Sequence, residues 1–344
     1  MQHPLSHRRS ILFAIAFCFL MVVFVLFAYG YYLMSPAKGG GDDQLFIVRD
    51  GATLKEVAGE LNRREIITNK GLFLFWARLM GHSTNIKAGE YVLNSGMPPL
   101  KILNVLSKGA VLLHPVTIPE GFTRMQIGEL LEKRGLIKKK EFLSLTENPE
   151  ISKRYGVSGT GLEGYLYPDT YHFGRGLPAI SVIDTMVNRF RQVTAPFRKR
   201  AEELDMTMQE VVILASIVEK ETGRAKERPL IASVFLNRLE KNMRLESDPT
   251  VIYGLKKFDG DLTREHLNQS TPYNTYIIRG LPPGPISNPG KEAIKAILYP
   301  ADSKYLYFVS KNDGSHYFSE TLSEHNKAVE IYQKKRRGTR RKNP

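Results

Sequence analysis

Residues 207–223 read TMQEVVILASIVEKETG, and this stretch determines how the whole chain is interpreted. Thr207 and Glu210 have the Thr-x-x-Glu spacing of a capping box, which predicts that a helix begins here. Gly223 stands where a helix-ending glycine is expected. Between these ends the residues are apolar almost all round, a pattern typical of a core helix rather than a surface helix.

This helix carries two glutamates that face different ways. At roughly 100° per residue, Glu221 shares a stripe with Leu214, Ile217 and Val218, whereas Glu219 falls on nearly the opposite side. A carboxyl group at the end of an apolar stripe is poorly solvated, which raises its pKa. An acid that stays protonated near neutral pH can donate a proton to a leaving oxygen, so Glu221 is the first candidate for a catalytic acid.

A structural role for Glu221 is the alternative. The side chain could extend from a frayed last turn or pair with Arg224 or Arg228, and structural ion pairs also perturb acids. On spacing alone, this structural role is the more common outcome.

The N-terminal segment Ile11–Met34 contains 24 residues without a charged side chain. About 20 apolar residues suffice to span a bilayer as a helix, so we expect an uncleaved anchor here. Arg8 and Arg9 precede it and Asp42 and Asp43 follow it, so the positive-inside rule keeps the N-terminus in the cytoplasm. A cleavable signal peptide is the competing interpretation, but its apolar core would be only about 7–15 residues long.

Cysteine and charge restrict the chemistry outside the anchor. The single cysteine, Cys18, lies within the apolar segment, so the outer part has no disulfide and no thiol nucleophile. No His-Glu-x-x-His pair occurs among the eight histidines, which argues against a zinc hydrolase. The net charge is +14, and residues 334–344 carry seven Lys or Arg and no acid. Such a tail is typically solvated, and nucleic acid is an unexpected partner because the outer part faces away from the cytoplasm.

Two stretches of the outer part have similar sequences. Residues 47–67 read IVRDGATLKEVAGELNRREII and residues 116–137 read VTIPEGFTRMQIGELLEKRGLI. In both, a predicted strand leads through a glycine turn and a threonine into a helix that contains Gly-Glu-Leu. We interpret them as two copies of one small α/β unit, the alternative being coincidental capping chemistry.

Beyond Glu163 the chain alternates between longer helices and aromatic-rich segments. EGYLYPDTYHF, SDPTVIYG, TPYNTY and GLPPGPISNPG are predicted loops rich in Tyr, Pro, Gly, Asn and Asp. Tyrosine rings beside polar side chains suit carbohydrate, although buried tyrosines also fill cores. The candidate polar set near the acid helix is Glu221, Asn237, Asp248, Tyr253, Tyr273 and Asn274.

An ordinary glycosidase needs two carboxylates about 5–9.5 Å apart. Glu219 and Glu221 cannot form that pair because they point to opposite sides of one helix. Asp248 is the only obvious second carboxylate in these segments.

Several long motifs resemble those of the endolytic murein transglycosylases of the MltG (YceG-like) family. They are ASIVEKETG, ASVFLNRL, MRLESDPTVIYG, TPYNTYIIRGLPPGPISNPG and YLYFV with GSHYFS, in the family's order. The resemblance implies that Glu221, the second glutamate of Glu-Lys-Glu-Thr, is catalytic. It also implies LysM-like glycan-binding units, whereas the basic tail departs from the family's pattern.

The resemblance further implies lytic cleavage rather than hydrolysis. The β-1,4 bond between N-acetylmuramic acid and N-acetylglucosamine breaks, and the muramyl 6-hydroxyl closes on C1 to leave a 1,6-anhydro end. One enzyme acid suffices for this reaction, with no metal and no organic cofactor. Expected partners are peptidoglycan glycan strands, the bilayer and cell-wall synthases. The rival hypothesis is a non-catalytic, membrane-tethered glycan-binding protein that recruits synthases.

The predicted fold class is α+β, and the predicted site of action is the outer face of the inner (cytoplasmic) membrane, which is the periplasm in a Gram-negative cell. The predicted divisions are a cytoplasmic N-terminus (1–10), a transmembrane helix (11–34), a linker (35–43), a LysM-like domain (44–110), a YceG-like catalytic domain (111–333, with a second LysM-like unit at 111–160) and a basic tail (334–344).

Overall fold

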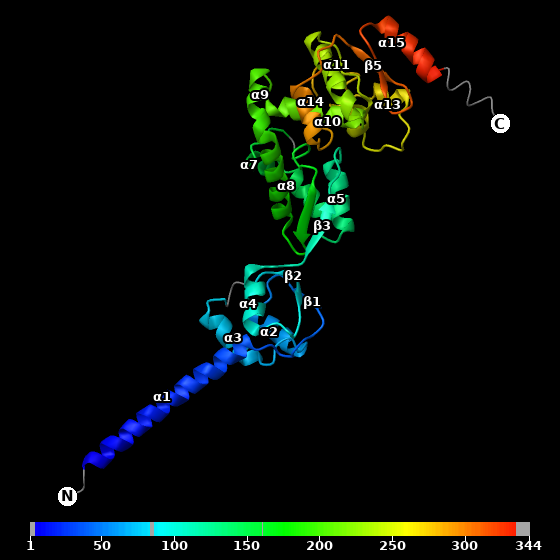
Figure 1. Cartoon of the computed structure of the whole chain (residues 1–344). Coiled ribbons are helices and arrows are strands. Elements are labelled where there is room, and N and C mark those ends of the chain that lie inside the picture. The colour runs from blue at the N-terminus through cyan, green and yellow to red at the C-terminus, as the bar shows by residue number, and fades with distance from the viewer. Residues whose placement is uncertain (1–3, 83–85, 160, 335–344) are drawn as a thin grey trace, which may run out of the picture. The chain divides into compact units, whose positions relative to one another are not determined.

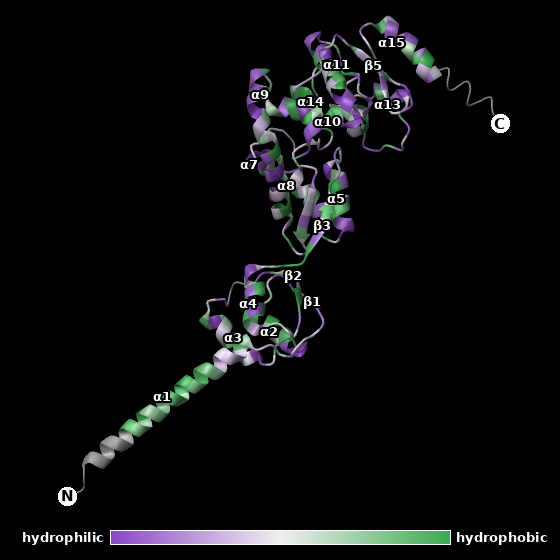
Figure 2. Cartoon of the chain, viewed as in Figure 1, coloured by the Kyte–Doolittle hydropathy of each residue, from purple (hydrophilic) through white to green (hydrophobic). Residues whose placement is uncertain are grey.

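The chain begins with one long helix, α1 (Pro4–Met34), in a computed structural model that describes residues 4–82, 86–159 and 161–334 (Figure 1). Its segment Leu12–Met34 is long and apolar enough to cross a membrane by length and composition. Figure 2 colours this segment as hydrophobic along most of its length. Most of the basic tail, residues 335–344, lies outside the described residues.

The chain divides into two compact units. The first unit comprises residues 1–114 together with 173–177, and the second comprises 115–172 together with 178–344. The division therefore falls near the predicted boundary at residue 110, and a short later segment joins the first unit.

Apart from α1, the described residues of the first unit form a two-stranded antiparallel sheet and three helices. Its elements are β1 (Gln44–Val48), α2 (Leu54–Arg63), α3 (Lys70–Leu79), β2 (Gly89–Leu93) and α4 (Pro99–Lys108). Phe46 lies opposite Tyr91 in the sheet, and both rings are buried against Leu61, Phe73 and Ile102 from the helices. Apolar side chains at alternate strand positions and on one face of each helix thus form one core.

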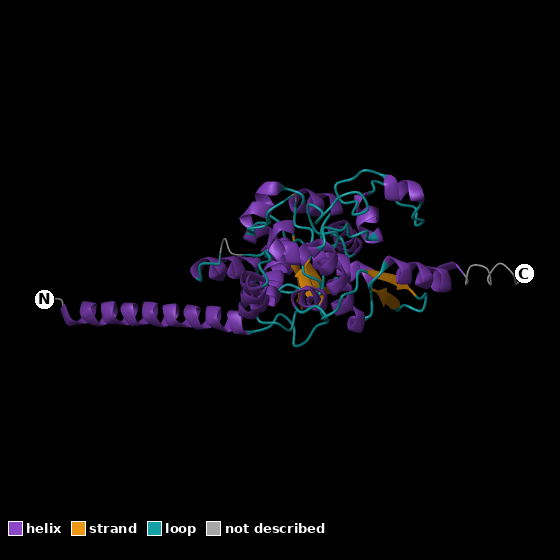
Figure 3. Cartoon of the chain, turned by 90° about the horizontal axis from the view of Figure 1, so that it is seen from above, coloured by secondary structure: helices purple, strands orange, loops and turns teal. Residues whose placement is uncertain are grey.

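The second unit is mainly helical, and Figure 3 shows that helices and loops predominate over strands in the chain as a whole. Its elements, starting with a strand that crosses the boundary, are β3 (Leu113–Thr117), α5 (Arg124–Lys133), α6 (Lys139–Thr146), α7 (Pro149–Arg154), β4 (Thr170–Gly174), α8 (Ala179–Thr194), α9 (Arg198–Glu203), α10 (Met208–Glu221), α11 (Arg228–Glu240), α12 (Asp248–Gly254), α13 (Arg264–Asn268), α14 (Lys291–Leu298), β5 (Tyr307–Ser310), β6 (His316–Ser319) and α15 (Leu322–Val329). Helix α10 packs against α11, α12 and α14, so it occupies the centre of this unit.

The two similar sequence stretches have the same local structure. Helices α2 and α5 are each 10 residues long and each begins with a capping box, at Thr53 and Thr123. The preceding turns contain Gly51 and Gly121, both with φ of 73°, a left-handed conformation that favours glycine. The likeness is consistent with two copies of one unit, and the LysM-like assignment stays a prediction.

Three predicted details were wrong. Gly223 was predicted to end helix α10. The helix ends instead at Glu221, Thr222 is extended, and Gly223 does not have the left-handed conformation of a helix-ending glycine. Residues 248–254 form helix α12 rather than a loop, because Pro249 lies in the first turn, where its missing N–H is tolerated. The end of the segment EGYLYPDTYHF is strand β4 rather than loop.

Candidate active site

The site is built on helix α10. Thr207 Oγ1 accepts a hydrogen bond from Glu210 N, and the Glu210 carboxylate accepts one from Thr207 N, so the predicted capping box is present. Residues 211–218 are all buried. The helix therefore emerges from the core at its C-terminal end, where its last residue is Glu221.

Glu221 has the environment of a proton donor. Its side chain is partly buried, and Ser247 Oγ donates a hydrogen bond to its Oε1. Burial raises the pKa of Glu221 to about 7, the Ser247 hydrogen bond opposes that rise, and the negative charge of Asp248 adds to it. Near neutral pH the carboxyl group is thus divided between its protonated and ionised forms.

Glu219 has the structural role that was the alternative for Glu221. Its Oε1 accepts from Arg228 Nη2 at 3.1 Å and its Oε2 accepts from Gly290 N at 2.9 Å, while only 6% of its side chain is exposed. Arg224 donates instead to the carbonyl of Asp313 at 2.6 Å. The two arginines that were possible partners of Glu221 are therefore engaged elsewhere in the described structure.

Ser247 is held in position by two threonines. Its backbone N donates to Thr275 Oγ1 at 3.0 Å, and its carbonyl accepts from Thr250 Oγ1 at 2.6 Å. The two threonine hydroxyls lie 2.8 Å apart. Ser247 occupies the N-cap position of α12, but its hydroxyl points to Glu221 instead of capping the helix. Ser247 was not predicted as a site residue, because it lies 26 residues from Glu221 and its segment was predicted to be a loop.

Asp248 lies beside this contact and is exposed. Its Oδ1 accepts from Tyr276 Oη at 2.7 Å. Tyr276 also lines a groove of about 470 Å³ on the second unit, whose other lining residues are Arg244, Glu246, Arg264, Leu267, Asn268 and Ile277. A polar groove therefore begins next to the residues that contact Glu221.

The tyrosines Tyr253 and Tyr273 form a ring pair near a second buried acid. Their ring centroids are 4.8 Å apart with planes at 63°. Tyr253 Oη donates to Glu163 Oε2 at 3.1 Å. Helix α12 carries Ser247 at its start and Tyr253 near its end, so it connects Glu221 with Glu163.

Glu163 is a second residue that was not predicted from the sequence. It is 5% exposed, and its carboxylate also accepts from Arg124 N at 2.9 Å and Asn288 Nδ2 at 2.8 Å. Burial raises its pKa to about 7, and the hydrogen bonds from Arg124, Tyr253 and Asn288 favour the charged form. The sequence does not indicate that Glu163 is buried, because its hydrogen-bond partners lie 39 to 125 residues away along the chain.

Asn288 joins this acid to the surrounding loops. Its Oδ1 accepts from Gly164 N and Leu166 N, both at 2.9 Å, and its Nδ2 also donates to Phe122 O. Packing here is tight, because a Cβ on Gly164, whose φ is 88°, would lie 2.5 Å from Pro285 Cγ.

Asn237 and Asn274, both predicted to contact sugar, make hydrogen bonds within the chain. Asn237 Nδ2 donates to the carbonyls of Ser303 and Tyr305. Asn274 is fully buried, its Nδ2 donates to two backbone carbonyls, and its Oδ1 accepts from Tyr276 N. Both amides therefore hold segments of the fold together. Within the residues described, no group of three His, Cys, Asp or Glu side chains is placed to hold a metal ion.

The fold and the site together define an α+β protein with an N-terminal apolar helix and a partly buried carboxyl group at the end of a buried helix. The chain belongs to the YceG-like family, whose sequence model matches residues 46–331. This confirms the predicted family.

Relatives and a solved structure agree with this membership. A Bacillus subtilis (strain 168) protein named endolytic murein transglycosylase is 31% identical over 323 residues, which cover 89% of each chain. A protein of the same name from Streptococcus pneumoniae (strain D39) is 28% identical and matches 88% of this chain but 61% of its own length. The crystal structure of a YceG-like protein from Listeria monocytogenes is 35% identical, with a TM-score of 0.59 over 84% of this chain and all of that one.

Proposed function

We propose that this chain is an endolytic peptidoglycan lytic transglycosylase with Glu221 as its catalytic acid. The observation that carries the proposal is the partly buried carboxyl group of Glu221 at the C-terminal end of α10, whose pKa burial raises to about 7 and which, unlike Glu163, receives a side-chain hydrogen bond only from Ser247 among the contacts of the described residues. The names of the relatives from Bacillus subtilis and Streptococcus pneumoniae support the same reaction class.

The reaction needs one group that first gives and then takes a proton. Protonated Glu221 donates its proton to the glycosidic oxygen as the bond from that oxygen to muramyl C1 breaks. The carboxylate formed then accepts the proton of the muramyl 6-hydroxyl as its oxygen bonds to C1. The products are a free N-acetylglucosamine hydroxyl and a 1,6-anhydromuramyl end, with no water consumed.

Neighbouring groups support this cycle. The Ser247 hydroxyl stabilises the carboxylate form between the two proton transfers, and the charge of Asp248 favours its return to the acid. The oxocarbenium-like charge at C1 is stabilised by the substrate's own acetamido group, as in substrate-assisted glycosidases. We assign Asp248, Tyr253 and Tyr273 to sugar binding, with Glu163 holding the Tyr253 hydroxyl in place.

Membrane anchoring would determine where the enzyme acts. Helix α1 would hold the two units outside the cytoplasm, close to where glycan strands leave membrane-bound polymerases. Cutting nascent strands internally would end their elongation, and cell-wall synthases are the expected partners. We further propose that residues 44–110 and 111–160 are LysM-like units that bind glycan.

The test is the chemistry of the product ends. The full chain in detergent is incubated with purified glycan strands, and mass spectrometry is used to look for 1,6-anhydromuramyl ends. Glu221→Gln should abolish these products and leave the circular dichroism spectrum unchanged. Glu240→Gln, at an exposed position on α11, is the matched control and should cut normally. Full activity of Glu221→Gln would show that another residue is the catalytic acid. Products with plain reducing ends would point to hydrolysis.

A further inference from the structure

Helix α3 in the first unit has apolar side chains that the core leaves uncovered. Phe73 and Ala77 are its buried residues. Four other apolar residues follow the spacing i, i+3, i+4, i+7 along one side of the helix and are named here the α3 stripe: Leu72, Phe75, Trp76 and Leu79. Phe75 is 52% exposed and Leu79 is 64% exposed, whereas Leu72 and Trp76 are half-buried and the Trp76 Nε1 is buried. A surface helix of a soluble domain normally carries polar residues at such positions.

The α3 stripe is attached to the end of helix α1. The ring of Phe75 lies 5.8 Å from that of Tyr29, and Tyr32 Oη donates a hydrogen bond of 2.8 Å to the carbonyl of Asn69. Asn69 is the N-cap of α3. Both contacts lie within the first unit, so α3 is held against the last two turns of α1.

The length of α1 indicates that both contacts would lie at the same depth in a bilayer. The apolar span starts at Leu12, and a helix rises about 1.5 Å per residue, so about 20 residues cross a hydrocarbon core of about 30 Å. A bilayer entered at Leu12 is therefore left near Tyr31. Tyr29 and Tyr32 then lie at the boundary between acyl chains and headgroups, where aromatic side chains are favoured. Phe75, which touches Tyr29, lies at the same level.

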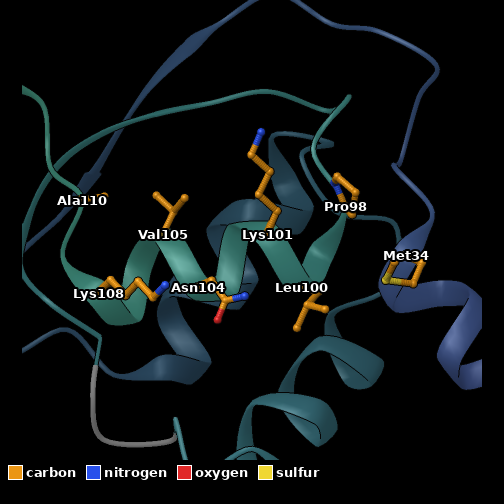
Figure 4. A pocket seen from close by; sticks show the side chains of 8 residues that line it. All are labelled: Met34, Pro98, Leu100, Lys101, Asn104, Val105, Lys108 and Ala110. Carbon is orange, nitrogen blue, oxygen red and sulfur yellow. The ribbon is translucent and has the colours of Figure 1, made fainter.

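Positive charges lie on the other sides of α3 and along α4. At about 100° per residue Lys70 falls nearly opposite the stripe and Arg78 falls on its flank. A groove of about 350 Å³ along α4 is lined by Met34, the last residue of α1, and by Lys101 and Lys108 (Figure 4). Apolar residues on one face with cationic residues on the other are typical of helices that lie in the surface of an anionic bilayer.

We propose that the α3 stripe lies in the bilayer interface, so that the first unit binds the membrane surface directly as well as through its anchor. The inference rests on the membrane insertion of α1 proposed above. The occupant of the stripe is the glycerol and upper acyl region of a phospholipid bilayer. This contact would hold the first unit at a defined height above the membrane, which a single flexible tether would not do.

The chain contains one tryptophan, and it is Trp76. Tryptophan fluorescence therefore reports on the α3 stripe alone. The full chain is reconstituted in vesicles of phosphatidylcholine and phosphatidylglycerol whose acyl chains are brominated either near the headgroup or near the methyl end. We expect blue-shifted emission, strong quenching by the shallow bromines, weaker quenching by the deep ones and protection from aqueous iodide. Emission that iodide quenches freely and bromine leaves unchanged would overturn the proposal.

Variants separate the stripe from the anchor. Phe75→Glu combined with Leu79→Glu should abolish quenching by brominated lipid and expose Trp76 to iodide, while the protein still floats with vesicles. Ile47→Glu, at a position 55% exposed on β1, is the matched control and should keep the wild-type quenching. Failure of the wild-type chain to float would refute insertion of α1 itself. Flotation without lipid quenching would refute only the interfacial helix, whether or not iodide is excluded, because the fold itself half-buries Trp76.

Discussion

Removing the Ser247 hydroxyl should move the pH dependence of catalysis in a known direction. In Ser247→Ala the carboxylate of Glu221 loses the hydrogen bond that favours its charged form, so its pKa should rise above the present value of about 7. Cleavage starts from protonated Glu221, so activity falls as pH rises through this pKa. The fall should therefore occur at higher pH in the variant.

The size of the change follows from the strength of that bond. A hydrogen bond to a charged group contributes about 1.5–3 kcal/mol, and one pH unit corresponds to about 1.36 kcal/mol, which gives about one to two pH units. Water can replace part of the lost bond, so the lower end, about one pH unit, is expected.

The assay is the rate of formation of 1,6-anhydromuramyl ends from purified strands, measured across the alkaline side of the pH profile. Ser247→Thr keeps a hydroxyl at the same position and serves as the control, with an alkaline limb close to that of the wild type. If the alkaline limb of the pH–rate profile does not move in Ser247→Ala, or moves to lower pH, the assignment of Glu221 as the catalytic acid is refuted.

Three further changes test the surroundings of the site. Asp248→Asn removes a negative charge that raises the pKa of Glu221, so the alkaline limb of the same pH–rate profile should move to lower pH, opposite to Ser247→Ala. Asn288→Ala leaves buried partners of its amide unpaired, and urea unfolding followed by circular dichroism should show a loss of at least about 3 kcal/mol; a loss below about 1 kcal/mol would contradict its role as a hub. Arg228→Ala leaves the charge of Glu219 buried without its ion-pair partner and should cost about 3–5 kcal/mol by the same measurement. Adding Glu219→Gln to that variant should recover most of the loss, and no recovery would show that Arg228 acts through other contacts.

The sequence predicts those parts of the site that depend on neighbours along the chain. Helical periodicity separates Glu221 from Glu219, because four residues per stripe suffice to define a face. Capping spacing predicts where α10 starts, because the box needs only Thr207 and Glu210.

The sequence does not predict contacts between distant segments. Ser247 lies 26 residues from Glu221, and Tyr253 lies 90 residues from Glu163, so no periodicity connects them. The prediction of a loop at 248–254 was wrong for another reason. A seven-residue helix that contains a proline has too few turns to show helical periodicity. The burial of Glu163 was not predicted because glutamates are mostly exposed in proteins. It depends on hydrogen bonds from Arg124 and Asn288, which lie in distant segments.

Helix α12 has one consequence for how the enzyme can change over time. Ser247 and Tyr253 are separated by six residues of one short helix, about 9 Å along its axis. If Tyr253 binds sugar as proposed, a substitution that tilts or shifts this helix to fit a different sugar also moves the Ser247 hydroxyl that contacts the Glu221 carboxylate. Substrate preference and working pH are therefore traits that mutations in α12 alter together, and selection for one of them will be constrained by the other.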